Sequence, residues 1–535
     1  MNPSATKLTS ELLPIGERIR RSYEQHADRI AVSDPRRQLT YRQLQSRASA
    51  VARGLRKLGC RPGDRLVLIA PNTVEWVEVD HACYIGGFVR VAPITRLHPH
   101  EIHGIISDAD PTVVVVDGAW LAEAVPGWLP EGIEHLVVIG APVDGALPFE
   151  ELVAQGSADN FEFGAHAAQD DQWIIYTSGS TGKPKGVRCT GLSLGAMTRN
   201  MLAEMPDMTS SDIALHTAPL SHFSGAVGLA VFAAGGCNVL RDSFQVHAVA
   251  TAVTELGVTL LPMVPTQITM LTDYLLDQNR VGKSLDASGI HQIPYAGSAI
   301  APDRLAKAQE VFGEVLLQFY GASEAPQPLT ALQPKDHLVE ATDGRLPRLA
   351  SAGRVNRFVE LKIVSPDGAE LPPGETGEIV VAGPQVMPGY WRLPEATSEV
   401  LSADGWLRTG DVGYLDEDGF LFIVDRKKDM VITGGFNVYP REVENAISTL
   451  GGVREVAVVG APSEKWGEEL VAVVSLQPDA DLTAEDVIGH CRSLIAGYKL
   501  PKKVTFVNEL PKSGTGKILK RTVHDELWSG RARNV

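Results

Sequence analysis

The stretch "YTSGSTGKPKGV" (176–187) decides how this chain is interpreted. It follows the apolar run "WII" and is dense in hydroxyl, glycine and lysine residues, as expected for a loop that binds phosphate. A Walker-type phosphate loop is excluded, because Gly179 and Gly182 are only three residues apart and Lys183 is followed by Pro184. The GxGxxG dinucleotide pattern fails as well. A flexible linker is disfavoured, because the preceding strand anchors the loop in the core.

The composition is that of an ordinary globular protein with several domains. The chain has 535 residues, of which 44% are hydrophobic and 21% charged, and its formal net charge is −16. This acidic balance argues against a general nucleic-acid or anionic-membrane partner. The five cysteines form no CxxC pair and no zinc-binding spacing, which predicts free thiols in a reducing compartment.

We expect a cytoplasmic protein without a membrane span. The first 21 residues contain no apolar core long enough for a signal peptide. Residues 213–240 lack Asp, Glu, Lys and Arg and are long enough to cross a bilayer. Because they include Pro219, Ser221, His222, Ser224 and several glycines, we expect a strand, a loop and a buried core helix there instead.

The pattern along the chain predicts an α/β fold. Residues 40–60 combine a Thr40/Gln43 capping box with helical apolar spacing. Short apolar runs that do not alternate are separated by helical patterns, which predicts doubly wound, mainly parallel sheets. These runs lie at 65–70, 112–117, 135–140, 173–179, 259–264 and 315–321.

The pattern changes twice in the last third of the chain. Alternating segments at 358–383 and 413–426, with Asp-Gly turns, predict antiparallel hairpins in a small β layer or barrel. After "DRKKD" (425–429) a helix from Pro440 and three further strands predict a compact α+β unit. We therefore expect a boundary between domains at 425–429.

The opening stretch closely resembles the phosphate loop of the adenylate-forming enzymes, which include acyl-CoA synthetases, aryl ligases, firefly luciferases and the adenylation domains of peptide synthetases. The other family landmarks follow in the family order, and the resemblance covers residues from about 17 to 525. They are "APLSHFSG" (218–225), "YAGSAIAP" (295–302), "QFYGASEA" (318–325), "TGEIVVAGP" (376–384), the long segment 404–444 and "PKSGTGKILKR" (511–521).

The resemblance implies a large AMP-binding and acyl-substrate domain (1–427) and a small, mobile α+β lid (428–535). It implies an ATP-dependent acid–thiol ligase of the acyl-CoA synthetase branch, with ATP, Mg²⁺ and coenzyme A. The acid first becomes acyl-AMP with release of pyrophosphate, and the acyl group then passes to the thiol. The partners are small molecules, and a homodimer is possible.

The resemblance also assigns roles within the nucleotide site. Glu324 binds Mg²⁺, and Ser323 stands where most relatives have Thr and offers its hydroxyl to the α-phosphate. Tyr320 stacks on the adenine, Asp411 accepts both ribose hydroxyls, and Arg426 lies near the ribose and phosphate. The remaining ATP-binding residues are Thr177, Ser178, Gly179, Ser180, Thr181, Gly182, Lys185, Gly297, Ser298, Ala299, Gly321 and Ala322.

Three further segments carry the two-step chemistry in the family. Lys517 in "SGTGK" bridges the substrate carboxylate and the α-phosphate during adenylation. Lys428 is the hinge about which the small domain rotates, and Gly434, Gly435 and Phe436 line the tunnel for the thiol. One departure has no assigned consequence: Gly191 stands where relatives often have His.

The acyl pocket is implied to border on His222. Phe223, Ser224, Gly225, Gly297 and Gly321 complete its expected lining. Small residues dominate the likely lining and suggest room for a bulky tail; they are Ser224, Gly225, Ala226, Gly228, Gly297, Ala299, Gly321 and Ala322. No acid lies between Ala214 and Leu240 to pair with a substrate ammonium, so an amino acid is disfavoured.

We therefore expect an uncharged fatty, alicyclic or aryl acid as the substrate. Coenzyme A is the first choice of acceptor, and Lys499, Lys502 and Lys503 either meet its phosphates or form a solvated basic face. The thiol of a carrier protein is the alternative acceptor. A non-catalytic module that binds AMP or acyl-adenylate is the alternative of another class, and nothing in the sequence indicates luciferase-type oxidation.

Overall fold

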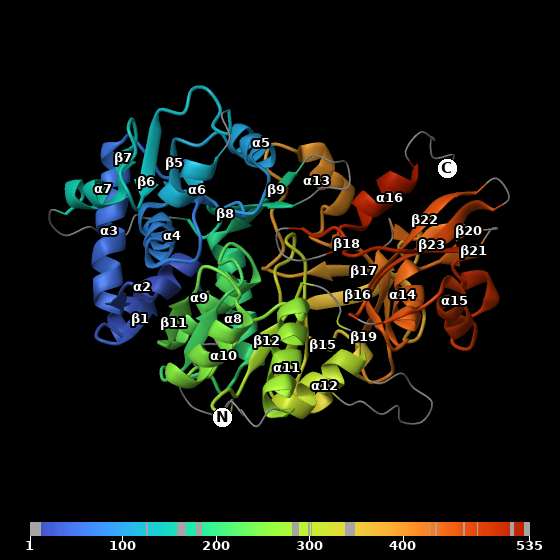
Figure 1. Ribbon diagram of the computed structural model, residues 1–535. Helices are drawn as coiled ribbons and strands as arrows, with labels where there is room; N and C mark the ends of the chain where they lie inside the picture. The colour runs from blue at the N-terminus through green and yellow to red at the C-terminus, as the bar shows by residue number, and fades with distance from the viewer. Residues whose placement is uncertain are drawn as a thin grey trace.

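The structure is a computed structural model of the full chain. It describes residues 12–124, 127–157, 167–177, 184–280, 288–297, 300, 302–337, 348–426, 429–433, 436–463, 466–478, 480–513 and 518–528. A large N-terminal domain of α/β layers is followed by a smaller C-terminal α+β domain, coloured orange to red in Figure 1. The expected fold class is confirmed.

The first sheet has seven strands and is parallel except for its last pair. Its order is β7 (Leu147–Pro148), β6 (His135–Ile139), β5 (Val113–Asp117), β3 (Arg65–Ile69), β4 (Val89–Val91), β8 (Asp171–Thr177) and β9 (Lys185–Thr190). Alternate residues of β3 and β5 enter different apolar clusters, so both faces of the sheet are buried. This burial explains why the strands read as continuous apolar runs.

Helices cover both faces of the first sheet. Leu66 and Leu68 of β3 share a cluster with residues of α3 and α4, whereas Val67 and Ile69 share one with residues of α5. The helices are α3 (Tyr41–Lys57), α4 (Val74–Gly86), α5 (Pro99–Ala109), α6 (Gly118–Glu123) and α7 (Phe149–Gln155). Helix α3 begins with the predicted capping box, in which the Thr40 and Gln43 side chains bond to each other's backbone N–H groups.

The second layer consists of two four-stranded sheets. One contains β10 (Ile213–His216), β11 (Cys237–Leu240), β1 (Ile30–Ser33) and β2 (Gln38–Thr40). The other contains β12 (Ile293–Tyr295), β13 (Leu316–Tyr320), β14 (Thr330–Leu332) and β15 (Arg354–Val355). Leu260 links them through parallel bridges to Ala214 and Gln292.

The strand predicted at 259–264 is wrong in detail. The segment makes only isolated bridges at Leu260 and Met263. Pro262 and Pro265 lie within or next to it, and proline has no N–H to donate to a ladder. The segment therefore joins the two sheets without becoming a full strand.

In the described part of the chain, six helices of 10 to 16 residues pack on this second layer. Helices α8 and α9 share a cluster with Ala214 and Leu317, whereas α10, α11 and α12 share one with Leu215 and Leu316. Their bounds, with α2, are Ile15–Gln25 (α2), Gly191–Glu204 (α8), Phe223–Ala234 (α9), Val246–Glu255 (α10), Pro265–Arg280 (α11) and Pro302–Phe312 (α12). Residues 213–240 contain the predicted strand and buried helix, β10 and α9, and end in β11, a second strand that was not predicted.

The antiparallel layer and the C-terminal domain complete the chain. The four-stranded layer is β16 (Glu360–Val364), β17 (Gly377–Ala382), β18 (Leu407–Leu415) and β19 (Leu421–Arg426), with α13 (Pro394–Val400). The C-terminal domain contains β20 (Val431–Thr433), β21 (Phe436–Val438), α14 (Pro440–Ser448), β22 (Val453–Ser463), β23 (Gly467–Leu476), α15 (Ala484–Arg492), β24 (Lys503–Phe506) and α16 (Lys520–Trp528). Both predicted antiparallel pairings, β16–β17 and β18–β19, are confirmed.

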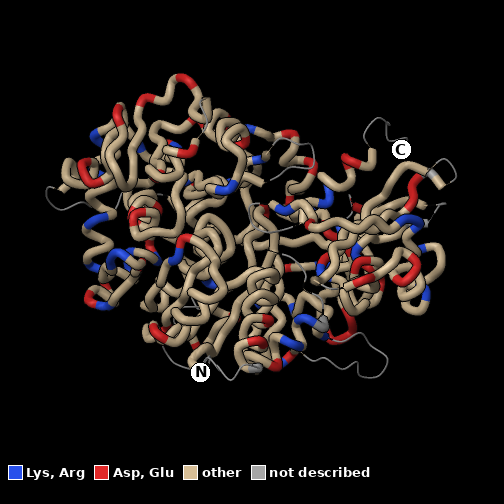
Figure 2. Tube along the Cα trace, in the orientation of Figure 1, with Lys and Arg blue, Asp and Glu red and all other residues tan. Residues whose placement is uncertain are grey.

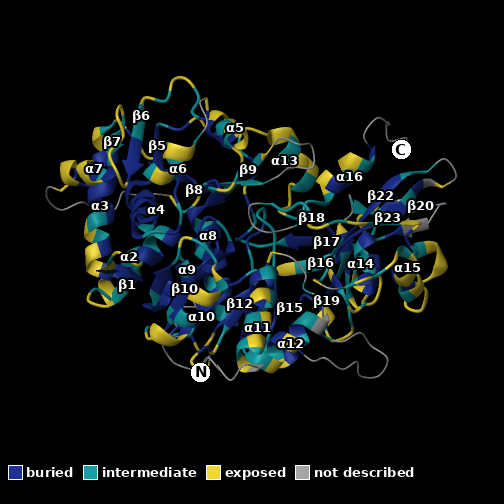
Figure 3. Ribbon diagram, viewed as in Figure 1, coloured by how far each residue is buried: buried dark blue, intermediate teal, exposed yellow. Residues whose placement is uncertain are grey.

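Burial follows this layering, whereas charged residues do not. Figure 3 shows the strands mostly buried, whereas α7, α13 and α15 carry exposed surface. Figure 2 shows acidic and basic residues interspersed along both domains. Among the described residues, no helix is both long enough and apolar enough to cross a bilayer.

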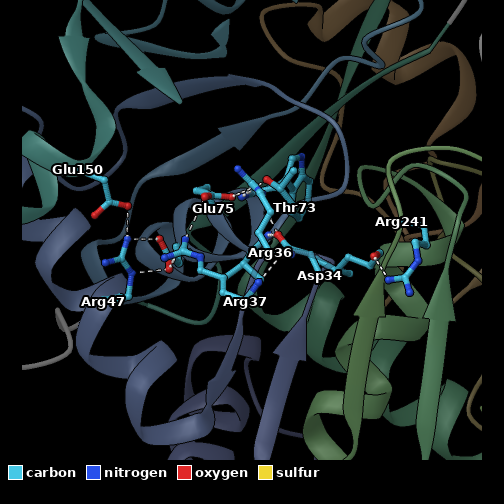
Figure 4. Close-up of polar contacts among 12 residues, drawn as sticks. Asp34, Arg36, Arg37, Arg47, Thr73, Glu75, Glu150 and Arg241 are labelled. Carbon is cyan, nitrogen blue, oxygen red and sulfur yellow. Dashed lines mark hydrogen bonds and ion pairs between the residues drawn. The ribbon is translucent and has the colours of Figure 1, made fainter. Parts of the chain in front are cut away.

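An ion-pair network joins the β1–β2 turn to α3, α4 and α7 (Figure 4). Its centre is Glu78, whose side chain is fully buried between Arg47, at 2.5 Å, and Arg37, at 3.0 Å. Arg47 also reaches the exposed Glu150 at 2.6 Å. The network therefore ties a strand pair of the second layer to the helices of the first.

Candidate active site

A cleft of about 1900 Å³ lies between the N-terminal layers and the C-terminal domain. The carboxyl end of β8, the carboxyl end of β13 and the start of α11 contribute its floor. The opposite wall comes from α14 and from residues 512–513 and 518–522 of the C-terminal domain. Because the carboxyl ends of parallel strands open here, the cleft lies where open α/β sheets bind ligands.

A tyrosine and an arginine orient an acid at the centre of this cleft. The Tyr320 hydroxyl donates a hydrogen bond of 2.7 Å to Asp411 Oδ2, and Arg426 Nε lies 3.4 Å from Oδ1. Burial, and next the charge of Asp411, raises the pKa of Tyr320 well above its usual range. The phenol is therefore a fixed donor, and Asp411 lies at the cleft with its carboxylate held in one orientation.

A second acid, Glu324, lies near Lys185, which belongs to the stretch 176–187 quoted at the start of the sequence analysis. The Tyr390 hydroxyl donates a hydrogen bond of 2.9 Å to Glu324 Oε1, and the Lys185 ammonium lies 5.0 Å from the centre of the Tyr390 ring. Glu324 Oε2 has no hydrogen-bond partner among the described residues. Thr177 pairs with Lys185 where β8 and β9 begin to diverge, so these residues flank 178–183.

The geometry of Glu324 fits a Mg²⁺ ion bound together with phosphates. In the part of the chain that the structure describes, no three His, Cys, Asp or Glu side chains gather as a metal site. Mg²⁺ is commonly bound by only one or two carboxylates, with substrate phosphates and water as its other ligands. One open oxygen on a fixed carboxylate meets that requirement.

The loop before α9 brings His222 to the cleft. Asn72, in the loop after β3, accepts a hydrogen bond from Leu220 N at 3.0 Å and donates one to Ala218 O at 2.9 Å. His222 lines the cleft, and its Nδ1 lies 2.8 Å from Ser221 Oγ. The loop is thus held by a side chain that precedes it by about 150 positions in the sequence.

The C-terminal wall is held by buried charges. Asp425, at the end of β19, accepts hydrogen bonds from the backbone N–H groups of Arg426 and Arg441, both at 2.7 Å. Glu444 of α14 forms an ion pair of 2.8 Å with Lys520. Both pairs line the cleft, together with Lys512, Ser513 and Ile518.

The structure brings seven of the predicted residues together along the cleft. These are Thr177, His222, Gly297, Tyr320, Gly321, Asp411 and Arg426. Gly297 has a φ of +100°, which a side chain rarely adopts, and open space lies where a Cβ would be. The assigned roles of these residues stay predictions.

Other predicted residues lie elsewhere or outside the described part of the chain. Ser224 Oγ bonds to buried His216 at 2.8 Å, and Gly225 packs against the carbonyl of Leu220, so both face the interior. Phe223 is buried and packs edge-on against Phe319. The residues outside the described part are Ser178, Gly179, Ser180, Thr181, Gly182, Ser298, Ala299, Lys428, Gly434, Gly435 and Lys517, and Phe436 is described only as backbone of β21.

Comparison with known proteins identifies the family. The sequence profile of the AMP-binding enzyme matches residues 19–391, and that of the AMP-binding enzyme C-terminal domain matches residues 442–517. The chain belongs to the AMP-binding enzyme family. The predicted resemblance is confirmed over most of the chain.

Curated members of the AMP-binding family differ in the acid and in the acceptor. A feruloyl-CoA synthase of an Amycolatopsis species is 37% identical, with 91% of this chain and 93% of that protein covered. The medium/long-chain-fatty-acid–CoA ligase FadD8 of Mycobacterium tuberculosis is 35% identical, covering 93% and 87%. The fatty acid–[acyl-carrier-protein] ligase ScoC of Streptomyces coeruleorubidus is 33% identical, covering 93% of each.

A solved member of the family shares the architecture. The ATP-bound MatB of Rhodopseudomonas palustris has a TM-score of 0.84 and 28% sequence identity, with 96% of this chain and 99% of that chain covered. The overall fold is therefore that of an adenylate-forming enzyme.

The sequence reasoning missed several residues of the site, of which Tyr390 and Asn72 hold predicted residues in place. Tyr390 bonds to Glu324 from the segment between β17 and α13, and Asn72 orders the loop that carries His222. Asn72 follows a strand at its carboxyl end, which is a general signal for a ligand-side residue. For Tyr390 no comparable local signal exists, because its contact depends on the packing of residues 389–391 against β9.

Proposed function

We propose that the protein is an AMP-forming acyl-CoA synthetase that activates an uncharged carboxylic acid. The observation that carries this proposal is the cleft itself. One wall presents Tyr320, Asp411 and Arg426, and the other presents the residues on either side of 514–517, the segment that contains Lys517. A nucleotide and a carboxylic acid bound together in this cleft would lie within reach of both walls.

In the first step, a carboxylate oxygen of the acid attacks the α-phosphorus of ATP, and the bond to pyrophosphate breaks. Asp411, fixed by Tyr320, accepts hydrogen bonds from the ribose hydroxyls, which a carboxylate does with charge-assisted strength. The loop at 177–186 holds the β- and γ-phosphates through hydroxyl and N–H groups. Lys517 places a positive charge between the two anionic groups that must meet.

Glu324 is the residue that would hold Mg²⁺ on the phosphates, through its open Oε2. The ion would screen the charge that otherwise repels the carboxylate from the triphosphate. Tyr390 holds Oε1 of Glu324 and so limits how the carboxylate can turn.

In the second step, the thiol sulfur attacks the acyl carbon and AMP leaves with the former carboxylate oxygen. We propose that the C-terminal domain, beginning near residue 428, rotates about Lys428 between the two steps. Gly434, Gly435 and Phe436 then line the path of the thiol. The two-step scheme rests on the family match at 442–517, which includes Lys517.

The acid is uncharged apart from its carboxylate. Within 214–240, which contains α9 and its flanking strands, the chain has no charged residue to pair with an ammonium or a second carboxylate. Feruloyl and fatty acyl groups, which the named relatives activate, have this property. Coenzyme A is the proposed acceptor, and the ScoC relative makes a carrier-protein thiol the second candidate.

The test is pyrophosphate release with MgATP across a panel of fatty, alicyclic, aryl and amino acids, with and without coenzyme A. We expect strong release with one uncharged class, an increase on adding coenzyme A, and a thioester product. Release that ignores coenzyme A but rises with a phosphopantetheinylated carrier protein would establish the second candidate. Binding of AMP with no release for any acid would instead favour a non-catalytic binding module.

A single variant separates the two half-reactions. Lys517→Ala should lower adenylation by about a thousandfold, the upper range for one electrostatic group, because the bridging charge is lost. Transfer from supplied acyl-adenylate to coenzyme A should fall far less. Equal loss of both half-reactions would contradict the two-conformation scheme.

A further inference from the structure

His222 occupies an unusual place at the start of α9. It is the residue that caps the helix, yet its side chain makes no capping hydrogen bond, although its carbonyl accepts one from Ala226 N. The ring is instead turned so that Nδ1 lies 2.8 Å from Ser221 Oγ. Because Asn72 fixes the backbone at Ala218 and Leu220, this arrangement is held from outside the loop.

The surroundings of Ser221 decide the direction of that hydrogen bond. Ser221 is buried, and His222 Nδ1 is the one partner of its hydroxyl in the described part of the chain. If Nδ1 carried the ring proton, the hydroxyl hydrogen would lack an acceptor, which is costly for a buried donor. The hydroxyl therefore donates to Nδ1, and the ring proton lies on Nε2.

The remaining ring nitrogen opens on the cleft. His222 lines the cleft, and Nε2 has no hydrogen-bond partner among the described residues, nor is it among their enclosed, unpartnered atoms. A neutral ring presents there a single N–H donor. A substrate oxygen is the kind of atom that such a donor binds.

The electrostatics keep the ring neutral. Burial, and next the charge of Arg90, lowers the pKa of His222 to about 4. Arg90 is itself buried and forms an ion pair of 2.9 Å with Asp80. The N-terminus of α9 adds partial positive charge at the same place and acts in the same direction.

We propose that Ser221 is a positioning residue that fixes the tautomer of His222, so that His222 Nε2–H donates a hydrogen bond to an oxygen of the acyl group. The inference rests on the proposed function and deepens it. The same donor serves the carboxylate of the free acid and the carbonyl oxygen of the acyl-adenylate. In the first step no proton leaves the ring, because the attacking carboxylate oxygen carries none.

Nitrogen-15 NMR of histidine-labelled protein tests the tautomer without any substrate. The His222 signals are assigned by their loss in His222→Gln. We expect a protonated Nε2 and an unprotonated Nδ1 at neutral pH, a mixture of tautomers in Ser221→Ala, and the original pattern in Ser221→Thr. A protonated Nδ1 in the unmodified protein, or an unchanged pattern in Ser221→Ala, would overturn the proposal.

Kinetics test what the positioned donor does. Ser221→Ala should lower kcat for pyrophosphate release by about threefold to tenfold, as expected for one hydrogen bond, with the KM for ATP unchanged. Ser221→Thr should recover most of the loss. Ser22→Ala is the matched control, because Ser22 is equally buried on α2, donates to Arg18 O at 3.0 Å, and lies away from the cleft.

The NMR and kinetic measurements distinguish failure of the proposed function from failure of the positioning role of Ser221. If no acid supports turnover, the proposed function fails while the NMR result still decides the tautomer. If turnover is normal but Ser221→Ala leaves kcat unchanged, the positioning role is wrong and the proposed function stands.

Discussion

Glu78 and Asp411 both contact arginine side chains, but we infer different functions for these two carboxylates. Glu78 is fully buried between Arg37 and Arg47, within the polar network of Figure 4 that extends to Arg36 and Glu150. Asp411 lies at the cleft, 3.4 Å from an Arg426 side chain that is 47% exposed. The first carboxylate is saturated by protein groups, whereas the second keeps its capacity to accept hydrogen bonds. The contrast separates charges that hold the fold from charges that are available to a ligand.

The largest expected effect concerns the ion pairs of the buried Glu78. Glu78→Gln leaves two arginines facing a neutral group in a buried place, and breaking such a pair destabilises by about 3–5 kcal/mol. We expect a loss of this size in the free energy of unfolding, measured with urea. Activity per folded molecule should change little, since Glu78 does not line the cleft.

Glu150→Gln is the matched control for that prediction. Glu150 pairs with the same Arg47, but its side chain is 65% exposed. Exposed pairs contribute at most about 1 kcal/mol, so the loss should be small. Equal losses in the two variants would remove the distinction between the buried centre and the rim of the network.

The next effect should appear at the cleft and in activity rather than stability. Asp411→Asn replaces the charge that we propose accepts the ribose hydroxyls, and charge-assisted hydrogen bonds contribute about 1.5–3 kcal/mol each. We expect the KM for ATP to rise by about tenfold to a hundredfold, measured by pyrophosphate release. An unchanged KM together with a large loss of stability would place Asp411 with Glu78.

A smaller effect should follow when only the orientation of Asp411 is disturbed. Tyr320→Phe keeps the ring for the proposed stacking on adenine and removes the hydroxyl that donates to Asp411 at 2.7 Å. One hydrogen bond of about 0.5–1.5 kcal/mol is lost. We expect a twofold to tenfold rise in the KM for ATP, and a rise as large as that of Asp411→Asn would mean that the hydroxyl itself contacts the nucleotide.

The smallest effect depends on pH, at an acid that pairs with histidine instead of arginine. His291 Nε2 lies 2.6 Å from Asp212 Oδ1, and the hydrogen bond with Asp212 raises the pKa of His291 above 6.5. The protonated form is thus favoured on folding, and its contribution is present below pH 6.5 and lost as pH rises through the folded pKa. We expect the free energy of unfolding to fall slightly between about pH 6 and 8, and His291→Gln to remove that slope. A slope that persists in His291→Gln would assign it to another group.

Local patterns predicted the elements whose physics is local. The apolar runs at 65–70, 112–117 and 135–140 became parallel strands, because burial on both faces leaves no alternation. The Thr40/Gln43 pair capped α3 as expected, since all its partners lie within four residues. The segment 259–264 was predicted to be a strand, but Pro262 within it and Pro265 next to it limit it to isolated bridges.

Contacts between segments that are distant in the chain could not be predicted from the sequence. Asn72 holds a loop about 150 residues away, and Tyr390 reaches Glu324 across 66 positions. Ser224 faces the interior because it bonds to His216 at the end of β10, and no spacing rule predicts that contact. The roles of Lys517, Lys428 and the residues at 178–182 rest on the family motifs and stay predictions.

The most direct test of the acyl-adenylate route follows one oxygen atom. An acid labelled with ¹⁸O in both carboxylate oxygens is turned over with MgATP and coenzyme A, and the released AMP is analysed by mass spectrometry. The acyl-adenylate route predicts one ¹⁸O in each AMP and one in each thioester, because a labelled oxygen becomes bonded to the α-phosphorus and leaves with it. Unlabelled AMP, or ¹⁸O found in inorganic phosphate, would contradict an acyl-adenylate formed in this cleft.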